Sequence, residues 1–256
     1  NERVNGIDEF LAVLERAAKS WPMTMGWIDC LSQGSSMGRG VLTAGGWATS
    51  EEAPAEPPPH AKEITFPVEL PDWALNPTTA TLFNHAYYWK HMDHRTEGIM
   101  RPDAFFYPLD AILHWNRAYG PRGFTQYQCV IPRAAGAEGV REFMRLLTRL
   151  GGASPLCVIK DCGPEGKGVL SFPLEGTSIA VDMAVSPELP RIIDHLNAFV
   201  IAAGGRMYLT KDRFTRAEHF RAMEPRLPRF FALRDKYDPQ RRLRSAQSVR
   251  LFGDKA

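Results

Sequence analysis

Several features that would assign this sequence to a common class are missing from it. No apolar run approaches the roughly 20 residues that cross a bilayer, and no basic start followed by an apolar core marks a secretory signal. The four cysteines form no C-x-x-C pair and precede no histidine at zinc-finger spacing, so we expect buried, reduced thiols. There is also no Walker loop, no HExxH and no GxSxG. We therefore expect a cytoplasmic or membrane-associated globular protein without a nucleotide loop of its own.

The net charge is small, but the charges are unevenly distributed along the chain. The net charge is +2, yet residues 206–256 carry 14 Lys and Arg against 6 Asp and Glu, a net of +8, which leaves −6 for the remainder. A basic terminal segment on an acidic body is typical of a protein with an anionic partner. A cofactor phosphate, a phosphorylated substrate, a membrane surface and another part of the same protein are all possible partners. No recognised nucleic-acid motif accompanies the basic residues, so we expect no nucleic-acid partner.

The periodicity of apolar residues predicts an α+β fold. Residues 7–20 and 77–91 have helical patterns, and residues 21–31 and 38–47 predict two strands joined by a Gly- and Ser-rich turn. From residue 123 the order is strand, helix (137–150), strand (156–160), strands (169–173 and 178–185), helix from about 187, and strand (206–210). Helices on one side of a mainly antiparallel sheet fit this order, and its β-α-β-β-α-β part resembles a ferredoxin-like unit. Short helices at 217–223 and 227–237 follow, and then an extended, Arg-rich end.

Polar residues on the predicted strands are candidates for binding. Alternation places Gln126 and Gln128 on one face of their strand, and two amides there need partners such as a polyhydroxylated ligand or solvent. Lys160 ends the next strand, Asp182 shares a face with Ala180, and Lys211 closes the last strand. We expect Gln128, Lys160 and Lys211 to converge on one polar pocket that suits a phosphate or an oxyanion.

Two further groups of residues have alternative interpretations. Tyr107 and Trp115 are either core anchors or walls of a sugar or lipid pocket. His85, His91 and His94 have no clear third ligand partner, so we expect them on a solvated surface and predict no metal site.

Four motifs together resemble a known family. They are YPLDAILHWNRAYGPRGFTQYQCVIP from Tyr107, SFPLEGTSIAVDM from Ser171, GGRMYLTKDRF from Gly204 and RDKYDPQRRLRS from Arg234. The sequence resembles the decaprenylphosphoryl-β-D-ribose 2′-oxidase family, which has the vanillyl-alcohol-oxidase type of flavoprotein fold. Mycobacterial members have a cysteine at the position of Ala180, so no thiol acts there in this chain.

The resemblance implies that two parts of the chain belong to different domains. Residues 1–205 would form the substrate domain over the flavin, and residues 206–256 would complete an N-terminal FAD domain that precedes Asn1. Lys211 resembles the lysine near the flavin and the substrate hydroxyl, and Tyr208 a residue beside FAD. The side chains that resemble substrate-pocket residues are Tyr107, Trp115, Gln128 and Lys160.

The implied chemistry is oxidation of a secondary hydroxyl of a sugar or polyprenyl-phospho-sugar to a ketone with FAD as the cofactor. The partners would be the FAD domain, a lipid-linked or small sugar, and a nicotinamide-dependent reductase that completes an epimerisation. An aldonolactone or alditol oxidase is the alternative within this type of flavoprotein. A stand-alone sugar- or phosphate-binding module, and then an interaction protein with a basic tail, are the alternatives outside it.

Overall fold

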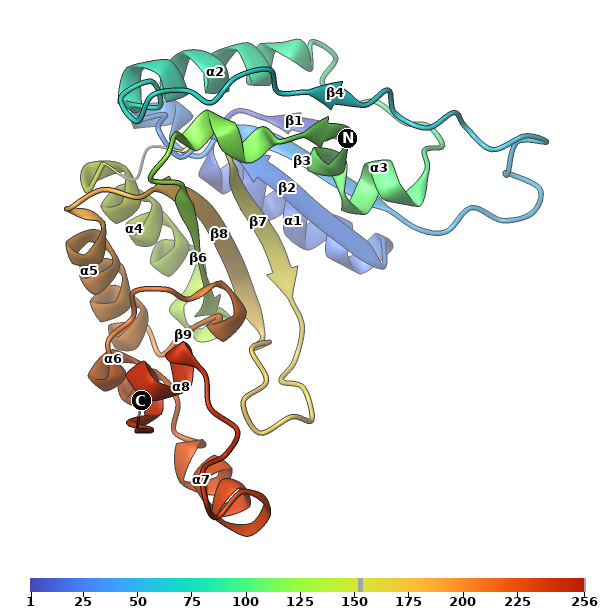
Figure 1. The fold of residues 1–256 in the computed structure, drawn as a ribbon. Coiled ribbons are helices and arrows are strands. Elements are labelled where there is room, and N and C mark those ends of the chain that lie inside the picture. Colours follow the sequence, from blue (N-terminus) through green and yellow to red (C-terminus); the bar gives the residue numbers. More distant parts are fainter. Residues whose placement is uncertain (152–153, 256) are drawn as a thin grey trace.

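The computed structural model describes residues 1–151 and 154–255, and a seven-stranded antiparallel sheet forms its centre (Figure 1). Every pairing between neighbouring strands of this sheet is antiparallel. The strand order is β1-β3-β2-β7-β8-β6-β9. The strands are β1 (Glu2–Val4), β2 (Met23–Ile28), β3 (Gly40–Gly45), β6 (Phe124–Pro132), β7 (Cys157–Cys162), β8 (Gly176–Ala184) and β9 (Arg206–Met207). A separate parallel pair joins β4 (Ile64–Thr65) and β5 (Ile112–Leu113).

Four of these strands and two helices form the ferredoxin-like unit that the pattern predicted. In chain order the unit is β6, α4 (Gly136–Arg149), β7, β8, α5 (Leu189–Ala202) and β9, and its strands lie side by side as β7-β8-β6-β9. The N-terminal strands β2, β3 and β1 extend the sheet beyond β7. The predicted α+β class with helices flanking an antiparallel sheet is therefore confirmed.

The main core lies between one face of the sheet and three helices, α1 (Ile7–Ser20), α4 and α5 (Figure 1). Helix α4 buries Val140, Phe143, Met144 and Leu147, the stripe that its sequence predicted. Phe10 of α1 lies so close to Gly26 and Gly40 that a Cβ at either glycine would overlap its ring. These two glycines let the helix approach the sheet, because any larger residue there would push α1 outward.

The opposite face of the sheet is covered only in part. Helix α2 (Pro77–Lys90) lies over the β2 and β3 side, where Tyr88 forms a small cluster with Trp27 and Val41. Short helices, α3 (Pro102–Phe106) and the 3₁₀ helices Pro108–Ala111 and Trp115–Tyr119, continue this layer (Figure 1). Further 3₁₀ helices at Gly34–Ser36, Arg133–Ala135 and Leu209–Lys211 complete the secondary structure.

The C-terminal segment contains three helices. Those predicted at 217–223 and 227–237 are confirmed as α6 (Ala217–Met223) and α7 (Leu227–Tyr237). The prediction of an extended end was wrong, because α8 (Ala246–Phe252) begins at Ser245, whose side chain accepts a hydrogen bond from the Ser248 amide. Phe220, Met223, Leu227 and Leu251 from these helices are part of the main core. No helix in the described ranges is long and apolar enough to cross a membrane.

Two predicted strands differ from the structure. Residues 169–173 belong to the irregular connection between β7 and β8, where the carbonyl of Ser171 accepts hydrogen bonds from the side chains of Arg206 and Arg226. Strand β9 ends at Met207 rather than Thr210. The Tyr208 amide still donates to the carbonyl of Gln128, but the chain then turns, and the amide of Lys211 donates to the Tyr208 carbonyl.

Candidate functional site

A polar strip crosses the partly covered face of the sheet. Antiparallel register places Gln126 opposite Asp182, Gln128 opposite Ala180, and Lys160 opposite Ser178. These positions share a face because side chains alternate along a strand, and the helix-packed residues Tyr127, Cys129, Ile179 and Val181 point the other way. The predicted alternation is therefore confirmed. We use the name polar strip for the side chains of Gln126, Gln128, Lys160, Ser178 and Asp182.

One end of the polar strip centres on a buried carboxylate. Asp182 is fully buried, its Oδ1 accepts a hydrogen bond from Gln126 Nε2, and its Oδ2 accepts one from the Tyr119 hydroxyl at 3.5 Å. Burial raises the pKa of Asp182 from 3.8 to about 6, although the charge of Lys211 and the hydrogen bonds from Gln126 and Tyr119 act against this rise. A strongly shifted carboxyl on a sheet face is typical of functional sites.

The other end of the strip combines an amide, a hydroxyl, a cation and an aromatic pair. Gln128 Nε2 donates to Ser178 Oγ at 3.0 Å, and Lys160 projects from the strand position opposite Ser178 with an exposed side chain. Tyr208, which follows β9 beside Gln128, stacks on Phe172 with ring centroids 4.5 Å apart. Of the three residues expected to converge, Gln128 and Lys160 both lie beside Ser178 at this end, and Lys211 does not contact them in the described part of the chain.

Lys211 is positioned by the C-terminal segment. Its 3₁₀ helix, Leu209–Lys211, is held by α8, because Gln247 Nε2 donates to the Leu209 carbonyl at 2.7 Å. The adjacent Asp212 is nearly buried, caps the Thr215 amide and forms an ion pair with Arg250 of α8. The Lys211 side chain itself is exposed, and its charge acts on Asp182. This lysine therefore lies near enough to Asp182 to act on it electrostatically, and its turn is held by α8.

The two predicted aromatic residues have different surroundings. Trp115 is half-buried, 5.0 Å from Phe124 between ring centroids, and it packs beside Tyr119, which reaches Asp182. It supports the wall of the site through Tyr119. Tyr107 is 63% exposed beside Phe106, and the contacts of the described residues do not bring it to the polar strip.

Sequence reasoning named Gln126 as a candidate for binding, gave Asp182 no role, and missed Tyr119. The alternation had already placed the first two on the right face, and a carboxylate in an otherwise apolar strand was the available signal. Nothing in the sequence pattern predicted that the 3₁₀ helix Trp115–Tyr119 would cover Asp182.

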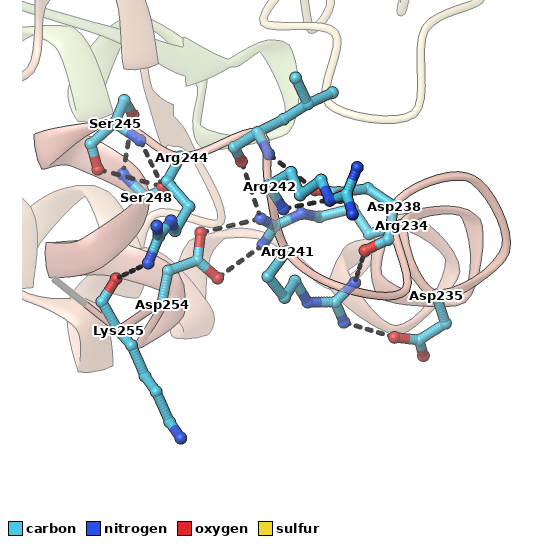
Figure 2. Close-up of polar contacts among 11 residues, drawn as sticks. Arg234, Asp235, Asp238, Arg241, Arg242, Arg244, Ser245, Ser248, Asp254 and Lys255 are labelled. Atoms are coloured by element: carbon cyan, nitrogen blue, oxygen red, sulfur yellow. Dashed lines mark hydrogen bonds and ion pairs between the residues drawn. The ribbon is translucent and has the colours of Figure 1, made fainter.

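Much of the positive charge of the C-terminal segment is compensated within the fold. Arg234 forms an ion pair with Asp254 at 2.8 Å, and Arg241 forms one with Asp235. Figure 2 shows both pairs. The Arg234 guanidinium also lies over the rings of Phe230 and Phe252. Arg242 contributes its backbone amide to Asp238, and within the described part of the chain its side chain has no ion pair. Both ion pairs lie within the segment and are already counted in its net charge of +8, so an anionic partner for this segment stays a prediction.

Other features of the described surface lie away from the strip. A hollow of about 140 Å³ lies between α1 and α4, and one of about 510 Å³ lies between α7 and α8. Among residues 1–151 and 154–255, no group of three or more His, Cys, Asp or Glu side chains is arranged to hold a metal ion.

Comparison with known proteins bears directly on the resemblance. No protein-family model matches the chain. Over 243 residues the chain is 31% identical to "Decaprenylphosphoryl-beta-D-ribose oxidase" of Mycolicibacterium smegmatis, and the match covers 91% of this chain and 52% of that protein. It is 28% identical over 253 residues to "Uncharacterized protein in mprA 5'region" of Streptomyces coelicolor, covering 93% of this chain and 67% of that protein. The chain thus spans about half the length of the first relative and two thirds of the second.

The fold and the comparison together define the class. The α+β fold with an antiparallel sheet and flanking helices is the fold class that the resemblance predicted. The resemblance itself is confirmed: the chain is a relative of decaprenylphosphoryl-β-D-ribose oxidase along nine tenths of its length.

Proposed function

We propose that this chain is the substrate-binding part of an FAD-dependent oxidoreductase that oxidises a secondary hydroxyl of a sugar or polyprenyl-phospho-sugar to a ketone. The single observation that carries the proposal is the exposed Lys211 on a fixed turn beside the polar strip, in a chain that is 31% identical to an oxidase of a phosphoribosyl lipid. An ammonium group above amide side chains suits a polyhydroxylated, partly anionic ligand.

The residues present fit a flavin over this face. The 3₁₀ helix Trp115–Tyr119 covers Asp182 on this face, and the exposed Lys211 and the Tyr208–Phe172 aromatic pair would offer a cation and flat rings to a flavin beside it. Tyr208 and Lys211 would contact the flavin. When bound, FAD supplies the electron acceptor that takes the hydrogen of the alcohol carbon together with two electrons.

The residues of this chain would act on the alcohol oxygen. Lys211 would donate a hydrogen bond to that oxygen as its proton leaves to water, because a fixed ammonium stabilises developing negative charge. Gln128 and Lys160 would bind further hydroxyl or phosphate oxygens of the substrate at the other end of the strip. The alcohol loses two electrons, its carbon-bound hydrogen and its hydroxyl proton, which leaves a ketone.

The proposal includes partners outside this chain. An FAD domain of the same polypeptide would bind the rest of the cofactor, and a nicotinamide-dependent reductase would consume the ketone. An aldonolactone or alditol oxidase is the alternative, since the polar strip would serve those polyols equally well.

A visible absorption spectrum tests the proposal. The protein would be expressed from its natural start codon beside the 256-residue chain, and both would be incubated with FAD. We expect flavin bands in the longer product that bleach without oxygen when ribose 1-phosphate is added. Bleaching by an alditol instead would favour the alternative oxidase. No flavin band in either product would overturn the proposal in favour of a sugar-binding module.

A further inference from the structure

The amide of Gln126 is held in one orientation by a group that can only accept hydrogen bonds. Asp182 lies opposite Gln126 in the β6–β8 register and is fully buried. An ionised carboxylate has no donor, so the amide nitrogen of Gln126 must face it, and Nε2 does donate to Oδ1. The second carboxylate oxygen accepts from the Tyr119 hydroxyl at 3.5 Å. The carboxylate thus fixes the direction of the neighbouring amide.

The carbonyl end of the same amide is available to a ligand. In the described residues, the buried side-chain polar atoms without a partner are Arg3 Nε, Asn84 Oδ1 and His219 Nδ1. Gln126 Oε1 is not among them, and no protein group donates to it in the described contacts. An unpartnered oxygen that is not buried is open to solvent. Gln126 therefore presents a hydrogen-bond acceptor on the polar strip, beside the turn that carries Lys211.

The orientation depends on the charge of Asp182. The groups that act on this carboxyl are Gln126 from β6, Tyr119 from the 3₁₀ helix, and Lys211 from the turn after β9. Of these, only Lys211 adds a positive charge, and its side chain is exposed. If the carboxyl gains a proton it becomes a donor, and the amide of Gln126 is then free to turn its oxygen inward. The strip would then offer an N–H where it had offered a C=O.

We propose that Asp182 is a positioning residue that holds the Gln126 amide with its carbonyl oxygen toward the substrate, where it accepts a hydrogen bond from a sugar hydroxyl. This inference rests on the proposed function. It assigns complementary roles to the two groups at this end of the strip: Lys211 donates to the oxygen that is oxidised, and Gln126 accepts from another hydroxyl. A site with such an acceptor favours a free hydroxyl over an ether or a deoxy position, because the acceptor would otherwise be left unpaired.

The first test needs no ligand. Side-chain amide resonances of Gln126 in the 15N-labelled 256-residue chain would be followed by NMR from pH 5 to pH 8, with Gln126→Met to assign them. We expect them to shift with a midpoint at about pH 6 in the wild-type chain and to stay constant in Asp182→Asn. Ser178→Ala is the matched control, since it alters the same strand and face without a titrating group, and it should titrate like the wild type. Resonances that do not move, or that move equally in Asp182→Asn, would overturn the inference.

The second test addresses recognition and uses the protein prepared for the flavin spectrum. The probe is methyl β-D-ribofuranoside, a neutral glycoside, because a phosphate would itself titrate in this window. We expect binding roughly tenfold tighter at pH 8 than at pH 5, the effect of one hydrogen bond, and no such change in Asp182→Asn. Equal affinity at both pH values, or no binding, would overturn the recognition role. The flavin bands decide the proposed function separately, so the two failures are distinguishable.

Discussion

Asp182→Asn should make the protein more stable at neutral pH. The pKa of Asp182 is raised from 3.8 to about 6 by burial. A tenfold change in a protonation equilibrium corresponds to about 1.4 kcal/mol, so keeping this carboxylate ionised in the folded state costs about 3 kcal/mol. Asparagine has nearly the same shape, can still accept from Gln126 and carries no charge. We therefore expect its free energy of unfolding at pH 7 to exceed that of the wild type by up to about 3 kcal/mol.

The direction of the pH dependence follows from which state binds the proton more tightly. Between pH 4 and pH 6 the folded protein holds the Asp182 proton that the unfolded chain has already lost, so wild-type stability from this group falls as pH rises. Below about pH 4 both states are protonated and the cost disappears. The stability gain of Asp182→Asn should thus grow from pH 4 to pH 7 and level off above it.

Urea denaturation followed by far-UV circular dichroism measures this difference at each pH. Ser178→Ala is again the control, since Ser178 is buried on the same strand and face and does not titrate. Its stability difference from the wild type should be the same at every pH. A difference between Asp182→Asn and the wild type that does not change between pH 4 and pH 7 would refute the assigned burial of a charge at this position.

Three other substitutions test the parts around this carboxylate. Lys211→Met should slow flavin reduction by roughly 10²-fold or more in anaerobic stopped-flow measurements. Because the side chain is exposed, the free energy of unfolding should change by less than about 0.5 kcal/mol. A wild-type rate of flavin reduction in this variant would remove the lysine from the site. Arg250→Ala removes the cation that pairs with the nearly buried Asp212, and it should lower the free energy of unfolding by about 3 kcal/mol in urea denaturation. Arg242 has no ion pair in the described part of the chain, so Arg242→Ala should lower it by less than about 0.5 kcal/mol. Glu165→Gln weakens the ion pairs that join the β7–β8 connection to Arg206 and Arg226. We expect faster cleavage of that connection in limited proteolysis, and a decrease of less than about 1 kcal/mol in the free energy of unfolding.

The sequence predicted best those elements whose apolar pattern is regular. The stripe on α4 and the alternation on β6 need only local periodicity, and both were right. The last strand was predicted too long because Arg206 to Thr210 has strand-forming residues, while the turn after Met207 comes from the hydrogen bonds of Tyr208 and of α8. Contacts between segments far apart in the chain decide such a boundary, and a single sequence does not display them.

The candidate site shows the same limit. Alternation placed Gln128 and Lys160 on one face, and the structure places them there. Tyr107 was grouped with them because it lies in the same motif, but proximity in sequence does not bring its exposed ring to the strip. Asp182 was placed on the correct face without a role. Its shifted pKa depends on burial under the helix that carries Tyr119, which follows from tertiary packing.

The basic C-terminal segment has a structural role that its net charge conceals. Arg250 holds Asp212, Gln247 holds the carbonyl of Leu209, and both belong to α8. Between these two contacts lies Lys211, the only described cation whose charge moderates the pKa of Asp182. A change in α8 would therefore alter the site without touching it. If this argument is right, Arg250→Ala should raise the midpoint of the Gln126 amide titration along with destabilising the fold, because Lys211 would no longer be held near the carboxylate. An unchanged midpoint in a folded Arg250→Ala protein would show that the turn holds Lys211 without help from α8.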